Sequence, residues 1–308
     1  MCIRLENYGY NSKHFIQSFS NHYVSTVEQG NYVACPLGAF FMLCTLLGSG
    51  GAKRNTSFQI GKALQIQRDG DDESCLERDY RYQWRKKKSI SIANAMYTRA
   101  DILMKEDFES QLVKCFDQQI YKINFRDQQS AMETINEWPQ EIHTDSIFNL
   151  FNIFHFKDVW EVPFMDMLTE NASFEVSSDR QIQVPIMSNE EELDYGDFKS
   201  EGFEIIRKPF KNSRFSFIVM LPKEKWNLTD LSGITGEKNI YVTTFQQKDV
   251  IRVDETGIEA GSVANLVVVP LSASLNPTEF HVTHPFVCSI YDHELKIPLV
   301  TARVLEPT

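Results

Sequence analysis

Residues Val250–Pro277 read VIRVDETGIEAGSVANLVVVPLSASLNP, and this stretch combines two conflicting patterns. The apolar run Leu266–Val269 has the β-propensity of a buried strand. It is followed at once by Pro270, small polar residues and an Asn-Pro turn signal, which is a composition typical of an exposed loop. Two hypotheses follow. The stretch is a loop in one state and a strand in another, or it is a half-buried strand with a bend at Gly257.

Alternate residues of this stretch differ in character. Every second residue from Ile258 to Val268 is small or apolar, whereas the intervening positions are mixed. Because successive side chains of a strand point to opposite faces, such a segment can enter a sheet whose interior is already filled. The β-branched residues of Val250–Val253 predict that the stretch itself begins as a strand.

The amino-acid composition limits which kinds of protein and which kinds of partner are compatible with this chain. The chain has 308 residues, of which 24% are charged, and its 42 acidic and 31 basic residues give a net charge of −11. This charge argues against a nucleic-acid partner and against binding to an anionic membrane surface. No apolar run reaches the length of a membrane span, and the N-terminal residues lack the apolar core of a signal peptide. An intracellular chain, another export route and a trimmed signal therefore all remain open.

Periodicity predicts helices mainly in the first half and strands mainly in the second, with no βαβ rhythm and no repeats. Helices are expected at about 12–27, 37–47, 56–64, 106–116 and 130–143. Strands are expected at 31–36, 89–97, 120–125, 148–160, 174–176, 181–187, 203–208, 215–221, 240–253, 279–291 and 295–304. This pattern predicts the α+β class and one domain over residues 1–308.

No residue cluster supports an enzyme or a metal site. His281 and His284 lie three apart on a predicted strand, so they point to opposite faces and cannot easily share a metal. The carboxylate run Glu190–Glu192 lies in a predicted turn and is interpreted as a solvated face. Nucleophile elbows, Walker loops and dinucleotide fingerprints are absent from the sequence. We therefore expect no catalytic residue, no metal and no cofactor.

The six cysteines are scattered without a CxxC pair, which excludes a zinc or disulfide framework. Cys35, Cys44 and Cys115 have the apolar surroundings of inert buried thiols. Glycosylation sequons, which are common in secreted proteins but also arise by chance, are found at Asn55, Asn171 and Asn227. The basic cluster at Arg78–Lys88 is compatible with binding a polyanion such as a sulfated sugar, or with a solvated helix face.

Several blocks of the chain resemble the serpins. Val253–Ala260, VDETGIEA, resembles the serpin hinge, which runs close to VNEEGTEA followed by small residues. His284–Val304 resembles the C-terminal signature of the family. Further serpin-like blocks follow the family order at Asn31–Leu37, Ile92–Ala95, Ile135–Trp138, Asn152–Phe164, Val184–Ser188 and Met220–Pro222. Because these blocks span nearly the whole chain, it is identified as a shortened member of the serpins.

The resemblance implies a serpin fold of three β-sheets and eight to nine helices, with an exposed reactive-centre loop at about 255–277. It also implies a suicide mechanism, in which a protease cleaves the loop, becomes acylated and is trapped as the loop inserts into the main sheet. The inserted strand would lie between Phe148–Trp160 and Ile240–Val253. The family's usual spacing from Gly257 gives the bond Leu271–Ser272. The implied hinge residues are Glu255, Gly257, Ile258, Glu259, Ala260, Gly261, Ser262, Val263 and Ala264.

The apolar side chain of Leu271 predicts a chymotrypsin-like or elastase-like serine protease as partner, since a trypsin-like pocket needs a cation. Two alternatives remain open, a non-inhibitory serpin-fold carrier and an inhibitor of cathepsin-like cysteine proteases. The resemblance further implies a monomer in the extracellular space, with a cytoplasmic location as the alternative.

The chain departs from the family in four ways. The first is a short link from the predicted helix at 130–143 into the predicted strand that begins at Phe148. Ile258 replaces a small residue, and overpacking at this point would cost about 1–3 kcal/mol and slow insertion. Between Pro222 and Asn239 the chain is shorter than the family, which would expose one edge of the strand at 240–253. The polar cluster that controls opening of the sheet is altered at Cys35, Gly38 and Gln247 and is retained at Asn152.

Overall fold

The computed structural model describes residues 30–64, 89–116, 118–124, 148–223, 251–258 and 278–307, together with Phe15, Ile16 and Ser18. The chain divides into two compact units, Met1–Phe15 with Leu37–His155, and Ile16–Pro36 with Phe156–Thr308. Each unit is described by itself, and the single domain over 1–308 stays a prediction. None of the described helices is long and apolar enough to span a bilayer.

The first unit is built around α2 (Pro36–Gly48), whose side chains are apolar on nearly every side and mostly buried. The hydroxyl of Thr45 donates to the carbonyl of Phe41 over 2.9 Å, which satisfies this polar group inside the core. The helix ends before Gly50, whose φ of 69° suits glycine. The helix predicted at 37–47 is therefore confirmed. The further helices are α3 (Arg54–Ala63) and α5 (Glu106–Phe116), also near their predicted positions.

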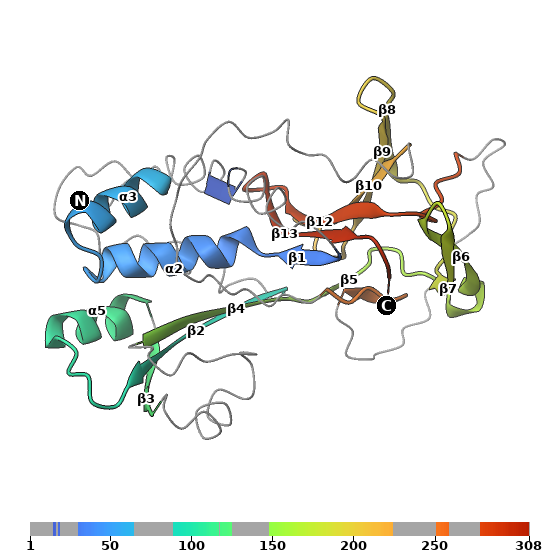
Figure 1. Ribbon diagram of the computed structural model, residues 1–308. Helices are drawn as coiled ribbons and strands as arrows, with labels where there is room; N and C mark the ends of the chain where they lie inside the picture. Colours follow the sequence, from blue (N-terminus) through green and yellow to red (C-terminus); the bar gives the residue numbers. More distant parts are fainter. Residues whose placement is uncertain are drawn as a thin grey trace. The chain divides into compact units, whose positions relative to one another are not determined.

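The sheet of the first unit has the strand order β3–β2–β4 (Figure 1). Its strands are β2 (Ile90–Arg99), β3 (Gln119–Ile123) and β4 (Phe148–Phe156). β2 and β3 are parallel, and the rings of Tyr97 and Tyr121 stack with centroids 5.0 Å apart. The prediction of a single strand over 148–160 is wrong in one respect. The strand is interrupted at Lys157 and continues as the short strand β5 (Asp158–Val159).

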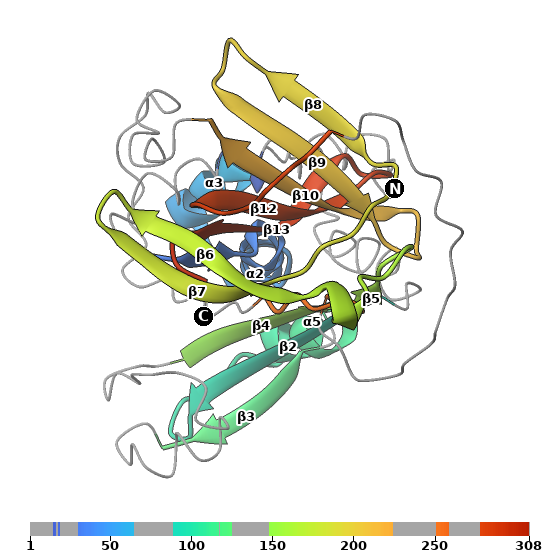
Figure 2. The same cartoon turned by 90° about the vertical axis from the view of Figure 1, so that its right-hand side faces the viewer.

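The second unit contains a six-stranded sheet with the order β1–β13–β12–β10–β9–β8 (Figure 2). The described pairings within it are antiparallel, which confirms the hairpin predicted around residues 211–213 and the one around 292–294. A separate hairpin is formed by β6 (Glu170–Ser177) and β7 (Arg180–Ile186). The six strands are β1 (Tyr32–Ala34), β8 (Asp194–Phe198), β9 (Phe203–Pro209), β10 (Phe215–Pro222), β12 (Phe286–Asp292) and β13 (Ile297–Val304).

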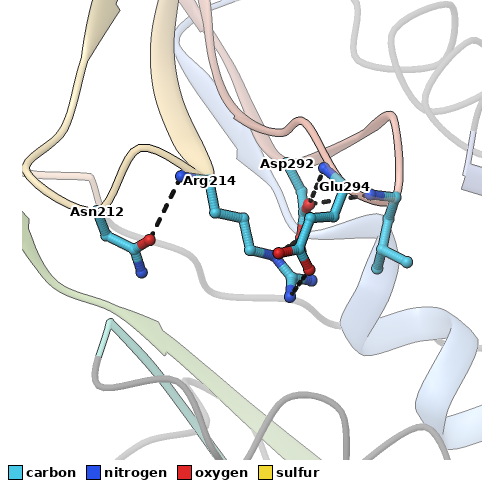
Figure 3. A network of polar contacts seen from close by, with 5 residues as sticks. Asn212, Arg214, Asp292 and Glu294 are labelled. Atoms are coloured by element: carbon cyan, nitrogen blue, oxygen red, sulfur yellow. Dashed lines mark hydrogen bonds and ion pairs between the residues drawn. The ribbon is translucent and has the colours of Figure 1, made fainter.

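A buried ion pair fixes the β12–β13 turn to the start of β10 (Figure 3). The Nε of Arg214 donates to Oδ2 of Asp292 over 2.8 Å, and both side chains are almost fully buried. The other carboxylate oxygen of Asp292 accepts the backbone N–H groups of Glu294 and Leu295 over 2.9 and 3.0 Å. Both oxygens of one carboxylate are thus used, one for the cation and one for the turn.

The same turn carries a titrating histidine. Burial, together with the positive charge of Arg207, lowers the pKa of His293 below its ordinary value of 6.5, against the opposing effect of Asp292 and Asp194. The unfolded chain therefore binds more protons than the folded chain as the pH falls below about 6.5, so stability is lost in this window. We expect the urea midpoint to fall between pH 7 and pH 5, and His293→Gln to flatten that fall. A His293→Gln profile as steep as that of an His281→Gln control would contradict this assignment.

The start of β1 is fastened to the end of the chain. The Oδ1 of Asn31 accepts the N–H groups of Leu305 and Glu306 over 2.7 and 2.9 Å. The carboxylate of Glu306 in turn pairs with the guanidinium of Arg180, at the start of β7. β2, α5 and β3 follow one another in the chain and β2 pairs parallel with β3, so this part is a single βαβ unit that the sequence did not predict. The described pairings of the six-stranded sheet are all antiparallel, in agreement with the α+β prediction.

Candidate functional site

The chain reverses direction at Asp254–Gly257. The Oδ1 of Asp254 accepts the N–H groups of Thr256 and Gly257 over 2.9 and 3.0 Å, and the hydroxyl of Thr256 over 2.6 Å. An aspartate that binds the backbone two and three residues ahead is typical of such turns. The strand predicted at 240–253 is not formed in its described part, where Ile251–Val253 contains only the bridge from Val253 to Ile258.

After this turn, β11 (Gly257–Ile258) pairs antiparallel with β5, which Figure 1 labels. Gly257 lies opposite Val159. The backbones approach so closely that a Cβ on Gly257 would lie 2.7 Å from the Cα of Val159, and closer still to the carbonyl oxygen of Asp158. Only glycine fits this pairing without moving the backbone. The side chain of Ile258 is 3% exposed, so it is already buried.

Three residues that follow β5 bind the turn. The backbone N–H and indole Nε1–H of Trp160 donate to the carbonyls of Thr256 and Asp254 over 2.9 and 2.8 Å. The N–H of Phe164 donates to the carbonyl of Glu255 over 2.8 Å, and the hydroxyl of Thr169 donates to the Glu255 carboxylate over 2.8 Å. The predicted hinge is thus held by its backbone and by its acidic side chain.

An aromatic cluster with a buried cation supports Trp160. The indole stacks on Phe210 with centroids 4.9 Å apart, and the edge of Phe164 completes the cluster. Nζ of Lys208 lies 4.4 Å from the Phe164 centroid and pairs with the Glu191 carboxylate. Burial lowers the pKa of Lys208, and Glu191 acts in the opposite sense. The interpretation of Glu190–Glu192 as a solvated face is therefore wrong for Glu191, whose side chain is 10% exposed.

The predicted site residues are only partly described. Gly257 and Ile258 pair with β5, whereas Glu255 is bound by Phe164 and Thr169, which follow β5. Cys35 is buried directly after β1, Gly38 is buried in the first turn of α2, and the backbone of Asn152 lies on β4. The residues outside the described part are Gln247, Glu259, Ala260, Gly261, Ser262, Val263, Ala264, Leu271 and Ser272.

The predicted modification and polyanion sites are placed in part. Asn55 on α3 and Asn171 on β6 are both exposed. Asn227 and the basic cluster at Arg78–Lys88 lie outside the described residues.

The histidine pair is not on a strand as predicted, because residues 278–285 are irregular. His281 is exposed beside Glu279, whereas Nε2 of His284 lies 2.7 Å from the carbonyl oxygen of Pro222. Within the described ranges, no group of three or more His, Cys, Asp or Glu side chains is placed to hold a metal ion.

The four described cysteines are present as thiols and not as disulfides. Cys35, Cys44 and Cys288 are buried, which for the first two agrees with the prediction of inert thiols, whereas Cys115 is partly exposed. Burial raises the pKa of Cys288 to about 12, so this thiol stays protonated at neutral pH.

Sequence reasoning missed the residues that hold the hinge. The sequence predicted no contact with the hinge for Trp160 or Thr169, and no turn-forming role for Asp254. One signal was available for Asp254, since an aspartate three residues before a glycine favours a tight turn. No local signal connects Lys208 with Glu191, because their contact depends on how the chain folds between them.

Comparison with known proteins agrees with this geometry. A family model described as "Serpin (serine protease inhibitor)" matches residues 10–231 and 225–307. This chain belongs to the serpins. It is 24% identical over 285 residues to Iripin-3 of Ixodes ricinus, covering 70% of this chain and 72% of that protein. It is also 24% identical over 330 residues to Alpha-1-antitrypsin 1-3 of Mus musculus, covering 84% and 79%.

Solved structures confirm the predicted serpin fold. A serpin from the trematode Schistosoma haematobium superposes with a TM-score of 0.82 at 28% identity, covering 97% of this chain and 100% of that one. Thyroxine-binding globulin in complex with thyroxine superposes with a TM-score of 0.76 at 18% identity, covering 97% and 99%. The family as a whole is one of serine protease inhibitors, and the fold of this chain is a serpin fold.

Proposed function

We propose that this chain inhibits a chymotrypsin-like or elastase-like serine protease as a suicide substrate. The protease cleaves Leu271–Ser272 and is trapped when the freed loop inserts into the main sheet. The observation that carries this proposal is the pairing of Gly257 and Ile258 with β5, because it is antiparallel and lies where an inserted loop would begin. Family membership supports the general activity, and the loop sequence supports the specificity.

The register of β11 and β5 defines how insertion would continue. Gly257 lies opposite Val159 and Ile258 opposite Asp158. Because the pairing is antiparallel, each later residue of the loop would lie opposite an earlier residue of the strand that contains β5. Continued past the break at Lys157, the same register would bring Ala260 opposite Phe156. The small side chain of Ala260 would need little room there.

The burial of Ile258 reduces the expected effect of having isoleucine where the family has a small hinge residue. The sequence predicts that this residue slows insertion because it must be buried early. In the structure Ile258 is 3% exposed and pairs with β5 in the uncleaved chain. Any overpacking at this residue is therefore part of the starting state. It adds little to the barrier after cleavage.

Incubation with chymotrypsin and with pancreatic elastase tests the proposal. We expect a covalent complex that survives boiling in detergent, together with a released peptide whose N-terminal residue is Ser272. Leu271→Arg should move the complex from these enzymes to trypsin, because only a trypsin-like pocket binds a cation. Clean cleavage after Leu271 with no complex for the wild-type chain would overturn inhibition.

A non-inhibitory carrier is the second candidate. Its support is the likeness to thyroxine-binding globulin, which was solved with thyroxine, and the shortened region between Pro222 and Asn239. A carrier would be cleaved as an ordinary substrate, without a large rise in melting temperature. Cathepsin-like cysteine proteases are a further possible class of target, and complex formation with them would redirect the proposal without changing the mechanism.

We also propose that the protein acts outside the cell. It is 22% identical over 317 residues to the human plasma serine protease inhibitor, covering 80% of this chain and 78% of that one. The exposed positions of Asn55 and Asn171 leave both sequons accessible to glycosylation. A cytoplasmic location remains the alternative.

A further inference from the structure

The buried lysine beneath the hinge contacts one short segment at three points. Its Nζ donates to the carbonyl of Val162 over 2.9 Å. It also lies 5.5 Å from the ring centroid of Trp160 and 4.4 Å from that of Phe164. Lys208 itself is held on β9, where it pairs with Phe217 of β10. One cation thus connects the rigid six-stranded sheet with residues 160–164.

The same segment carries the hinge. Trp160 donates two hydrogen bonds to the turn, and Phe164 donates a third. The two residues whose rings face Lys208 are therefore the residues whose N–H groups fix Asp254–Thr256. A cation over a desolvated aromatic face restricts the position of the ring. The position of Lys208 is transmitted to the hinge through these two residues.

The ion pair of Lys208 with Glu191 is expected to contribute little to the stability of the fold. Their side chains are 5% and 10% exposed, and two buried charges lose hydration that their attraction only partly restores. Apolar side chains of similar size would fill the same volume at no such cost. A role in orienting the rings of Trp160 and Phe164 would explain why a charged side chain is present at Lys208. An apolar side chain cannot form this cation–π contact.

We infer that Lys208, held in place by Glu191, is a positioning residue for loop insertion. It keeps residues 160–164 in the geometry that pairs the hinge with β5 before cleavage, so that insertion starts from a register that is already formed. This role rests on the proposed inhibitory function, but its structural part can be measured without a protease.

The test uses the double variant Lys208→Met with Glu191→Met, which removes both charges and keeps unbranched apolar side chains. Lys211→Met, at an exposed position in the turn after β9, is the matched control. Hydrogen exchange is measured in the uncleaved full chain. In the double variant the amides of Trp160 and Phe164 should exchange roughly ten- to thirtyfold faster, which is the factor that a desolvated cation–π contact contributes. Amides of β13 should be unchanged.

A second measurement tests whether the position of residues 160–164 affects inhibition. The number of inhibitor molecules consumed for each protease inactivated should rise several-fold in the double variant, because slower insertion lets the protease escape. Unchanged exchange at Trp160 and Phe164, in a double variant that melts within the range of the control, would overturn the positioning role. Faster exchange with unchanged consumption would overturn its link to insertion. If the wild-type chain forms no complex, the proposed function fails, and the exchange data alone decide the role of Lys208.

Discussion

Gly257→Ala is expected to convert the protein from an inhibitor into a substrate. The added methyl group would lie 2.7 Å from the Cα of Val159 and would also clash with the carbonyl oxygen of Asp158. Both are backbone atoms, so the strands must separate before the side chain fits. Without the pairing of β11 with β5 the loop has no register from which to insert. We expect at least tenfold more inhibitor to be cleaved for each protease trapped, measured by titration against chymotrypsin, since separating the strands costs more than about 1.4 kcal/mol.

Gly196→Ala is the matched control. A Cβ there would meet the ring of Phe198 and the side chain of Ile205 on the edge of the six-stranded sheet, where side chains can move. This variant should lose a little stability and inhibit normally. Equal inhibition by Gly257→Ala and Gly196→Ala would show that the β11–β5 pairing plays no part in trapping the protease.

Asp292→Asn is expected to destabilise the fold by about 3–5 kcal/mol, which is the usual effect of leaving a buried charge without its partner. The guanidinium of Arg214 has a side-chain exposure of only 5%, and the Asp292 carboxylate accepts from it through Oδ2. The substitution keeps the size of the side chain and removes the charge. The apparent melting temperature at a fixed scan rate should fall by roughly 10 °C.

Glu294→Gln separates this effect from an ordinary surface pair. Glu294 also contacts Arg214, but its side chain is 59% exposed and water can replace it. Its loss should change the free energy of unfolding by less than about 1 kcal/mol. If Asp292→Asn lowered the melting temperature no more than Glu294→Gln, the buried pair would not be the main support of the β12–β13 turn.

The elements that could be predicted from the sequence are those with dense patterns. The apolar runs of α2 and β10 leave few alternatives. β8 was missed because its sequence, DYGDF, has acidic residues and a glycine and is exposed along most of its length. It is a strand because β9 offers it an edge to pair with. The break at Lys157 was missed because β-propensity does not report where a strand bends.

The candidate site was predictable in its position and not in its contacts. Family resemblance predicted a hinge from Glu255 to Ala264, of which the structure describes Glu255–Ile258, and the sequence predicted a bend at Gly257. The contacts that explain this role come from Trp160 and Phe164, more than ninety residues earlier in the chain. The burial of Glu191 depends on Lys208 in a neighbouring strand, so a run of glutamates alone cannot reveal it. Contacts of this kind are properties of the folded chain.

The pairing of β1 with β13 also sets an order of events during synthesis. Tyr32–Ala34 lies opposite Thr301–Arg303, and Asn31 bonds to a residue 274 positions later. At ribosomal rates of about 5–20 residues per second, β1 waits on the order of tens of seconds for this neighbour to be made. Such distant contacts slow folding. The six-stranded sheet therefore closes only after β13 has emerged, and until then the edge of β1 is unpaired.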